Sequence, residues 1–278
     1  MSQDGQASIQ ARQYKCALIT GASSGLGEEY AHQLAPSCDS MILVARREEL
    51  LNTLATELKA AYPHIELYCA PVDLSTHDQR IGFINMIQER GLKPDLLVNN
   101  AGMGDYGTFT SAEWSKLDDM IQVNMTALTH LCHGFLPDMI EGGRGSIINV
   151  SSLASMLPIP DFAVYAATKA YVTSFSEALR LEVNDFGINI VAVCPGPVRT
   201  GFGKIAMREG AADKLPAREG FYTTKEQVVF DSIIALEANK ARVFPNWKIA
   251  AMAAGISLLP MAILRLALVS RRETSQSE

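Results

Sequence analysis

Short runs of apolar residues alternate along the chain with longer stretches in which apolar and polar positions recur at helical spacing. This alternation is typical of βα units, in which parallel strands buried on both faces are covered by helices. The apolar runs predict strands at 16–20, 40–45, 65–73, 95–100, 145–152, 188–195 and 241–245. The stretches between them predict helices near 25–35, 47–61, 76–90, 112–140, 161–186 and 225–238.

The alternation runs from residue 15 to residue 245 without a linker rich in Pro, Gly or Ser and without an internal repeat. We therefore expect one α/β domain at 15–245, a doubly wound parallel sheet of about seven strands with helices on both faces. An apolar C-terminal extension at 246–270 follows it. The polar tails at 1–14 and 271–278 are expected to be disordered.

Composition and charge agree with a folded chain that does not bind nucleic acid. Apolar residues make up 48% and charged residues 19%, far from the composition of a disordered protein. The formal net charge is −6 and no run of five basic residues occurs, which argues against binding to a phosphate backbone.

The cysteines indicate a reducing compartment. Their number is odd and they form no CxxC pair, as expected of free thiols in a cytosolic chain, so we assign no disulfide framework and no metal site. They stand at positions 16, 38, 69, 132 and 194. The first fifteen residues are polar and contain no apolar core of a secretory signal, so a cytoplasmic location is expected.

The first expected strand runs directly into a glycine-rich segment, TGASSGLG at residues 20–27. Gly21 would let the chain turn sharply, Gly25 would let the backbone approach a pyrophosphate, and Gly27 would let the next helix pack closely. Unpaired N–H groups at the start of that helix would bind the anion. A simple tight turn between a strand and a helix is the alternative interpretation.

A second group of polar residues lies near the end of the fifth expected strand. Tyr165 and Lys169, in the sequence YAATK, are four residues apart, so a helix presents both side chains on one face. Ser152 ends the apolar run 145–152, at the edge where open α/β sheets bind ligands. Tyr and Lys at this spacing often form an ordinary surface pair, but Ser152 and the glycine-rich segment favour a reactive site.

These segments resemble the motifs of the short-chain dehydrogenase/reductase family over roughly residues 15–238. The matching residues are TGASSGLG, Asp73 in PVDLS, NNAG at 99–102, Asn124 in IQVNMTALTH, Ser152, YAATK and PGPVRT at 195–200. Three residues separate Gly21 from Gly25, which matches the dehydrogenase branch, whereas the family's epimerases and dehydratases usually have two. The resemblance implies a single-domain Rossmann-type fold.

The resemblance also implies four catalytic residues. Tyr165 would be the general acid in carbonyl reduction and the general base in alcohol oxidation. The ammonium of Lys169 and the cationic nicotinamide would lower the phenol's pKa from its ordinary value near ~10. Lys169 would also hydrogen-bond the ribose, and Ser152 would hold the substrate oxygen beside Tyr165. Asn124 would complete a proton relay through water, or it is a polar residue satisfied inside a long helix.

For the cofactor, the resemblance implies that Asp73 meets the adenine end and that the backbone at 100–102 lines the nucleotide. Val198 and Thr200 would anchor the carboxamide after the turn at Pro195. The complete set expected at the cofactor is Gly21, Ser23, Ser24, Gly25, Leu26, Gly27, Arg46, Asp73, Asn100, Ala101, Gly102, Tyr165, Lys169, Pro195, Gly196, Val198 and Thr200. For Asn100 a turn-forming role at the end of a strand is the alternative.

Arg46 bears on the choice of nicotinamide. NAD-selective folds of this type usually carry Asp or Glu at the end of the second strand, whereas this chain has Arg46 followed by Arg47. A guanidinium can bind a 2′-phosphate in a bidentate manner, so NADP(H) is expected to be preferred over NAD(H). Two arginines on a solvated helix start are the alternative.

The segment 247–270 departs from the family's usual C-terminal strand and glycine-rich tail, so a tetramer is in doubt. A homodimer through the long helices near 112–140 and 161–186 is what the resemblance implies. Sixteen uncharged residues separate Lys248 from Arg265, which is too short a stretch to span a bilayer. We expect two short helices that meet near Pro260 and pack beside the substrate entrance or a partner subunit, with peripheral membrane contact as the alternative.

Two functions remain after these observations. The first is an NADP(H)-dependent oxidoreductase that moves a hydride between nicotinamide and a carbonyl or secondary alcohol carbon. The second is a catalytically silent NADP-binding sensor or interaction protein on the same fold. The complete Asn-Ser-Tyr-Lys set favours the enzyme. The largely apolar loop at 153–162 favours a lipophilic substrate over a free sugar.

Overall fold

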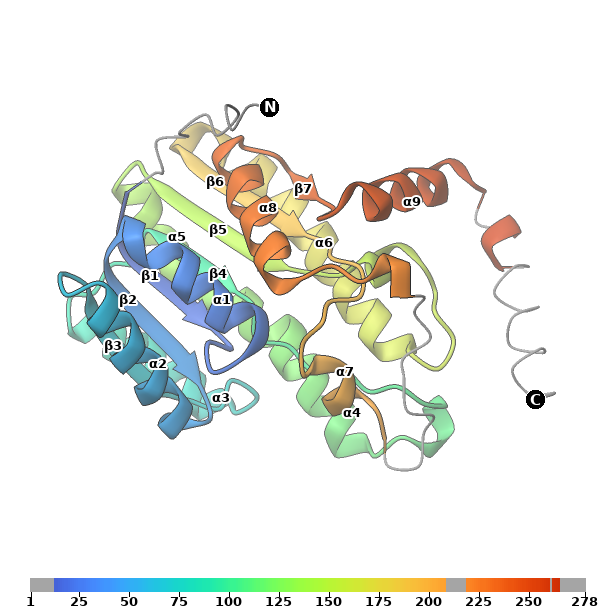
Figure 1. Cartoon of the computed structure of the whole chain (residues 1–278), viewed down its shortest axis with the longest axis horizontal. Coiled ribbons are helices and arrows are strands. Elements are labelled where there is room, and N and C mark those ends of the chain that lie inside the picture. The colour runs from blue at the N-terminus through green and yellow to red at the C-terminus, as the bar shows by residue number, and fades with distance from the viewer. Residues whose placement is uncertain (1–12, 209–218, 261, 266–278) are drawn as a thin grey trace, which may run out of the picture.

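The computed structural model describes residues 13–208, 219–260 and 262–265. Within these residues, seven parallel strands form one sheet in the order β3-β2-β1-β4-β5-β6-β7 (Figure 1). The strands are β1 (Tyr14–Thr20), β2 (Cys38–Ala45), β3 (Glu66–Pro71), β4 (Leu96–Asn99), β5 (Gly145–Val150), β6 (Ile188–Val193) and β7 (Arg242–Val243). The prediction of a doubly wound parallel sheet is confirmed.

Helices cover both faces of the sheet (Figure 1). One face carries α1 (Gly25–Leu34), α2 (Glu48–Ala61) and α8 (Lys225–Glu237). The other carries α3 (His77–Glu89), α5 (Leu128–Glu141) and α6 (Ala163–Glu182). Neighbouring residues of a strand enter opposite cores: Leu43 packs with the first group of helices and Ile42 with the second. Burial on both faces explains why the central strands are almost continuously apolar.

The strand order reverses between β1 and β4, and this reversal determines where a ligand can bind. The chain passes from β1 to β2 and β3, and then returns to place β4 on the other side of β1. The connections that follow β1 and β4 therefore leave the carboxyl edge of the sheet in opposite directions. Open α/β sheets bind their ligands at such a point.

Several element boundaries differ from the expectation. The helix expected at 112–140 is α4 (Trp114–Ile121), a π-helical turn η3 (Gln122–Ala127) and α5. The helix expected at 161–186 ends at Glu182, where a 3-10 turn leads to Gly187 with φ +72°. β1 includes the buried Tyr14, which the expectation had assigned to a disordered tail. The remaining tail residues, 1–12 and 271–278, lie outside the described residues.

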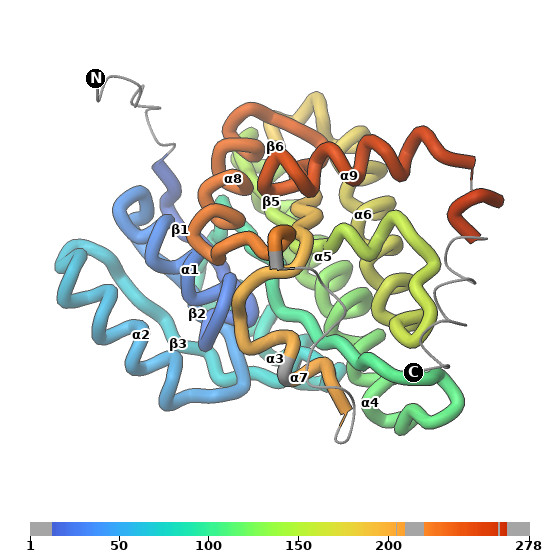
Figure 2. The backbone as a smooth tube through the Cα atoms, turned by 45° about the vertical axis from the view of Figure 1, so that its right-hand side comes forward, coloured from blue at the N-terminus to red at the C-terminus, as the bar shows by residue number. Residues whose placement is uncertain are grey.

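After β7, the chain forms α9 (Trp247–Leu258), which runs along the outside of the molecule away from the sheet (Figures 1 and 2). This helix contacts η4 (Leu153–Met156), the 3-10 turn that follows β5. Past Pro260, residues 262–265 form one more helical turn, and the rest of the second helix expected there lies outside the described residues. No helix in the described part of the chain is long and apolar enough to cross a membrane.

Candidate active site

The loop between β1 and α1 has the backbone shape that its glycines permit. Gly21 and Gly25 have φ values of +66° and +64°, which side-chain-bearing residues rarely adopt. Gly27 lies so close to the loop that a β-carbon there would stand 2.2 Å from the carbonyl oxygen of Gly21. The first helix therefore packs directly against a tight turn at the carboxyl end of β1.

Two serines and an arginine border this loop. The Nη2 of Arg47 donates to Ser23 Oγ at 2.9 Å and to Ser24 Oγ at 2.8 Å. Ser24 is the N-cap residue of α1, yet its hydroxyl accepts from Arg47 and not from an amide of the helix. Helix amides and a guanidinium cation therefore lie at one loop, which is an arrangement suited to phosphate. Arg46, the residue expected to meet the cofactor, is exposed beside Arg47.

The loop after β4 is tied to the glycine-rich loop by Asn100. Its Nδ2 donates to the carbonyl oxygen of Thr20 at 2.9 Å, and the backbone amides of Asn100 and Ala101 each donate to Thr20 Oγ1 at 3.0 Å. Asn100 therefore has the turn-forming role that the sequence left open. Asp73 also stabilises a turn, because its Oδ1 accepts from both the amide and the hydroxyl of Ser75 at 2.9 Å.

The segment after β6 reaches the same loop. A β-carbon on Gly25 would stand 3.6 Å from Thr200 Cβ, so Thr200 lies beside the glycine-rich turn. Val198 pairs with Thr223 in an isolated parallel bridge that holds this segment next to the chain entering α8. Both residues expected at the carboxamide end of the cofactor therefore lie at the carboxyl edge of the sheet.

The start of this segment also contacts the C-terminal extension. The carbonyl oxygen of Pro195 accepts from the amide of Leu153 at 2.8 Å, which joins the segment to η4. A β-carbon on Gly196 would stand 2.5 Å from Cδ1 of the buried Ile249 in α9. Because residue 196 is a glycine, the side chain of Ile249 can pack directly against it. This contact is a structural reason for glycine at position 196.

The four residues expected in catalysis come from three places in the chain: Ser152 bonds to Tyr165, Lys169 lies beside Tyr165, and Lys169 and Asn124 both lie beside Gly102. Ser152 lies two residues after the end of β5, where it caps η4, and Tyr165 and Lys169 lie on α6 with the ammonium 5.8 Å from the phenol ring centroid. A β-carbon on Gly102 would stand 3.3 Å from Asn124 Oδ1 and 3.4 Å from Lys169 Nζ. The missing side chain at Gly102 therefore leaves room for both polar groups.

Three hydrogen bonds hold the side chain of Asn124 in place. Its Oδ1 accepts from the amide of Met103 at 2.8 Å, and its Nδ2 donates to the carbonyl oxygen of Met103 at 2.9 Å and to Thr168 Oγ1 at 3.0 Å. The side chain is buried, in the π-helical turn between α4 and α5. It connects that turn with the loop after β4 and with α6, so its amide positions these three elements.

Burial sets the electrostatics of the site. It raises the pKa of Tyr165 to about 12, although a hydrogen bond with Ser152 acts in the opposite direction. It lowers the pKa of Lys169 to about 8, and Lys169 Nζ donates to the carbonyl oxygen of Val150 at 2.8 Å. Among the protein's own residues, the rise in the phenol pKa caused by desolvation is thus larger than the lowering expected from Lys169.

Aromatic side chains cover Tyr165. Phe162 stacks on its ring with the centroids 4.2 Å apart, and Phe202 lies 5.7 Å away in a tilted arrangement. Phe202 belongs to α7 (Phe202–Ala206), a short helix that the sequence analysis did not predict. Tyr106, from the loop after β4, contacts Phe162 edge-on at 5.7 Å. The reactive phenol therefore lies beneath an aromatic cover.

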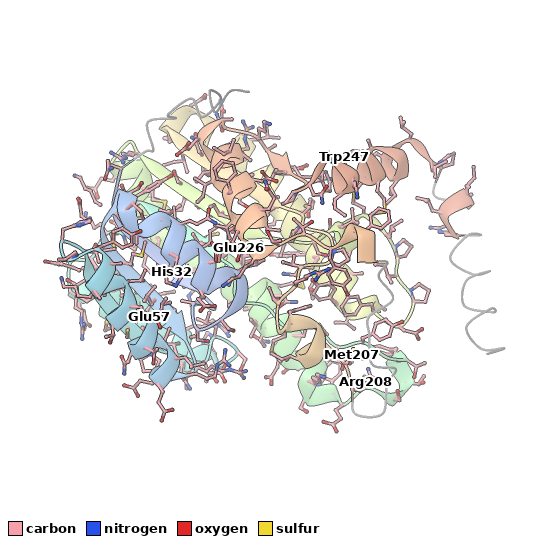
Figure 3. The ribbon with its side chains drawn as sticks, viewed as in Figure 1. His32, Glu57, Met207, Arg208, Glu226 and Trp247 are labelled. Atoms are coloured by element: carbon pink, nitrogen blue, oxygen red, sulfur yellow. The ribbon has the colours of Figure 1, made fainter. Side chains whose placement is uncertain are left out.

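A buried carboxylate attaches this cover to the rest of the site. Asp105 is 4% exposed and forms ion pairs with Arg208 and Lys116, the latter at 3.0 Å. Arg208 directly follows Met207 at the end of the α7 segment (Figure 3), and its Nη1 also donates to the carbonyl oxygen of Thr108 at 2.9 Å. We call Asp105, Arg208 and Lys116 the latch, since they join the α7 segment to the loop after β4.

Comparison with known proteins identifies this arrangement. A family model described as short chain dehydrogenase matches residues 15–209. The chain belongs to the short-chain dehydrogenase/reductase family. The probable oxidoreductase EphD of Mycobacterium tuberculosis is 30% identical over 264 residues, which cover 88% of this chain but only 43% of EphD. The very-long-chain 3-oxoacyl-CoA reductase of Rattus norvegicus is 33% identical over 78% of this chain and 69% of its own length.

Among solved structures, this short-chain dehydrogenase/reductase is similar to a short-chain dehydrogenase from Sphingobium yanoikuyae in complex with NADPH. The TM-score is 0.77 at 28% identity, and the match covers 95% of this chain and 96% of the other. The fold class and the family expected from the sequence are therefore confirmed.

Sequence reasoning missed three features of this dehydrogenase's site. Arg47, and not Arg46, contacts the serines of the glycine-rich loop, although both arginines were visible in the sequence. The helix α7 has five residues, too few to show a period. Asp105 and Arg208 are 103 residues apart, so no local pattern could have paired them.

Proposed function

We propose that this dehydrogenase transfers a hydride between NADP(H) and the carbonyl or secondary alcohol carbon of a lipophilic substrate. The observation that carries the proposal is the series of contacts that links Ser152 to Tyr165, Tyr165 to Lys169, and Lys169 to Asn124 beside Gly102. A silent nucleotide sensor on this fold needs the loop but has no need for an acid, a cation and a hydroxyl held together.

The glycine-rich loop fits a dinucleotide. A side chain at Gly21 or Gly27 would collide with the backbone or with Asn100, so only glycine allows the loop, α1 and the turn after β4 to pack this closely. The first turn of α1 and Arg47 would hold the phosphates, and Val198 and Thr200 would meet the carboxamide. When bound, the nicotinamide supplies or accepts the hydride.

The side chains then divide the proton chemistry among them. Ser152 Oγ accepts from the amide of Ala154 at 3.1 Å, and its own O–H, which shares a hydrogen bond with Tyr165, can turn to donate to a substrate carbonyl oxygen. Tyr165, whose pKa of about 12 keeps it protonated at neutral pH, donates a proton to the same oxygen during reduction. Lys169 stabilises the phenolate that this step leaves. Asn124 acts by positioning, because its amide already bonds to Met103 and Thr168.

Arg47 and Arg46 support a preference for NADP(H). The first is anchored at the glycine-rich loop and the second is exposed next to it, so both cations are available to a 2′-phosphate. The NADPH complex of the Sphingobium relative is consistent with this assignment. Titration of each variant with NADPH and with NADH tests it. Arg47→Asp and Arg46→Asp should weaken NADPH binding much more than NADH binding, and Arg90→Asp, at an exposed arginine of the opposite sheet face, should change neither.

The aromatic cover supports a lipophilic substrate. Leu117, Met120, Ile159, Phe162 and Phe202 form an apolar cluster around Tyr165. A panel of carbonyl compounds and alcohols with both nicotinamides, followed by the absorbance of reduced nicotinamide, tests the activity. We expect turnover of bulky apolar ketones or aldehydes and little turnover of free sugars. If no member of the panel reacts while NADPH binds normally, the sensor function replaces the enzyme.

A homodimer and a cytoplasmic location complete the proposal. Exposed or half-buried apolar side chains of α6 and the turn after it, among them Tyr171, Phe175, Leu181 and Phe186, support association through this side of the molecule. All five cysteines are free thiols, which supports a reducing compartment.

A further inference from the structure

Helix α9 is apolar around almost its whole circumference, yet it is covered on only one side. Apart from Lys248 and Ser257, its residues are hydrophobic or glycine. Only Ile249 and Ala253 are buried, where the helix rests on Gly196 and η4.

The side of α9 that faces outward carries a large apolar side chain at each end of the helix. Trp247, at its start, is 75% exposed, and Leu258, at its end, is 84% exposed (Figure 3 labels Trp247). Leu259 and Ile263 continue the apolar surface beyond the helix at 46% and 50% exposure. A contiguous surface of this kind is unfavourable in water and marks a contact site. We call Trp247, Leu258, Leu259 and Ile263 the α9 surface.

The segment of the sequence that carries the α9 surface contains basic residues and no acidic ones. Between residues 247 and 272 the sequence contains Lys248, Arg265, Arg271 and Arg272 but no Asp or Glu, although the chain as a whole has a formal charge of −6. Lys248 and Arg265 are exposed, and the other two arginines lie outside the described residues. The apolar surface therefore lies on a basic segment of a chain whose net charge is negative.

We propose that the α9 surface binds the interface of an anionic lipid bilayer. Trp247 and Leu258 are eleven residues apart, so the helix presents both on nearly the same outward side, and a flat lipid interface can bury an apolar side of this kind. Tryptophan at the helix start and basic residues near both ends are suited to the headgroup region. A second copy of the chain fits less well, because a twofold contact through this surface would bring its cations together.

Binding of the α9 surface to a bilayer would also determine the side from which a lipophilic substrate approaches the site. Because the inner side of α9 rests on η4 and on Gly196, lipid bound to the α9 surface would lie one helix away from the turn that follows Ser152. A lipophilic carbonyl compound held in the bilayer would then approach Tyr165 from the side of η4. This consequence rests on the proposed function, whereas the docking itself does not.

Flotation of the full-length protein with vesicles tests the docking without any assay of turnover. The vesicles are made of phosphatidylcholine alone or of phosphatidylcholine mixed with phosphatidylglycerol. We expect the protein to float with the mixed vesicles, to float less with the neutral ones, and to be released in part by added salt.

Paired variants separate the α9 surface from general effects. Leu258→Glu should lower the bound fraction on mixed vesicles about tenfold, and Leu50→Glu, the same exchange at an exposed leucine of α2, should leave it unchanged. Arg265→Glu should weaken binding to mixed vesicles only. Both exchanged leucines are exposed, so circular dichroism and the melting temperature should stay close to those of the wild type.

Three results would overturn the proposal. The first is a wild-type protein that does not float with the mixed vesicles, and the second is equal flotation of the wild type and Leu258→Glu. The third is a Leu258→Glu variant that loses a concentration-dependent oligomer but binds vesicles as the wild type does, since a second copy of the chain would then cover the α9 surface. Loss of turnover with normal flotation would count against the proposed function alone.

Discussion

Tyr165 and Lys169 lose contact with solvent when the chain folds, and this moves their pKa values in opposite directions. The phenol is held neutral, with a pKa of about 12, and the ammonium is made easier to deprotonate, with a pKa of about 8. Both changes oppose charge in a buried place. The neutral phenol is the form that a carbonyl reductase needs as its proton donor.

Tyr165→Phe should therefore remove the transferable proton with little change in shape. We expect turnover of a verified substrate to fall about 10²- to 10⁴-fold, which is the usual contribution of a general acid. NADPH binding, measured by fluorescence titration, should stay within about twofold of the wild type. A Phe variant with an unchanged kcat would show that another group supplies the proton.

Lys169→Met should abolish turnover but stabilise the fold. A buried lysine with a lowered pKa binds fewer protons in the folded chain than in the unfolded one, so wild-type stability should rise from about pH 8 to about pH 10.5. The variant lacks this rise. At pH 7 we expect its free energy of unfolding to exceed that of the wild type by about 1 to 2 kcal/mol, after allowance for the lost bond to Val150. Urea titrations of both proteins across this pH range check the sign.

The latch stabilises the aromatic cover through a carboxylate that is ionised when folded. Hydrogen bonds from Arg208 hold the pKa of Asp105 below its ordinary value. Stability from this group is present above the unfolded pKa near ~3.9 and is lost as the pH falls through the lower folded value.

Arg208→Met should leave Asp105 with Lys116 as its remaining cation and release the α7 segment. We expect a loss of about 1 to 3 kcal/mol in unfolding free energy at pH 7, smaller than for a fully uncompensated buried charge. The KM for the carbonyl substrate should rise several-fold while the Kd for NADPH stays constant. A matching rise in both constants would mean that the latch supports the whole site and not the cover over Tyr165.

At the scale of elements, the glycine-rich loop and α1 work as one unit because no side chain separates them. A β-carbon at Gly27 would stand 2.2 Å from a backbone oxygen and 2.6 Å from Asn100 Nδ2, and neither group can move without opening the turn. The same substitution costs little where space is free, as at Gly82 in α3.

Gly27→Ala should therefore weaken NADPH binding by at least tenfold and lower the melting temperature. Gly82→Ala is the matched control, and since it adds helix propensity on an open surface it should stabilise the protein by up to about 1 kcal/mol. Isothermal titration and thermal melts of both variants measure these effects. Normal NADPH binding by Gly27→Ala would mean that the loop can relax without losing its shape.

The helical region that precedes β5 is not one continuous helix. Its apolar spacing predicts one long element, but the π-helical turn at Gln122–Ala127 interrupts it and brings Asn124 into the site. π-helical turns occur often at functional sites. Apolar spacing could not show this one, because the residues on both sides of it keep a helical pattern.

At the scale of the whole molecule, α6 carries both the pair proposed for catalysis and the surface proposed for the dimer. Leu181 is 73% exposed near its end, and Phe186 is 47% exposed in the 3-10 turn that follows. Association through this side would stabilise the helix that holds Tyr165 and Lys169.

Sedimentation velocity should thus show a dimer for the wild type. Leu181→Glu should shift the population toward monomer by placing a charge in the apolar contact, and Leu50→Glu on α2 should not. A wild-type monomer at micromolar concentration, or a dimer unaffected by Leu181→Glu, would move the interface elsewhere or remove it.

Local patterns in the chain were sufficient for the strands, for most helices and for the motifs that carry the chemistry. Each of the seven strands was expected from a short apolar run, since a parallel strand buried on both faces leaves a continuous apolar signature. The glycine-rich loop and the Tyr165–Lys169 pair were visible for the same reason: each depends on residues a few positions apart.

The contacts that make the site work join residues far apart in the chain. Asn124 and Lys169 meet at Gly102, and Asp105 pairs with Arg208, because the sheet order and the π-helical turn bring distant segments together. The pKa values of Tyr165 and Lys169 follow from burial that the packing creates. The outward-facing side of α9 is also a result of packing, because its uniformly apolar sequence does not distinguish the stripe that rests on Gly196 from the rest.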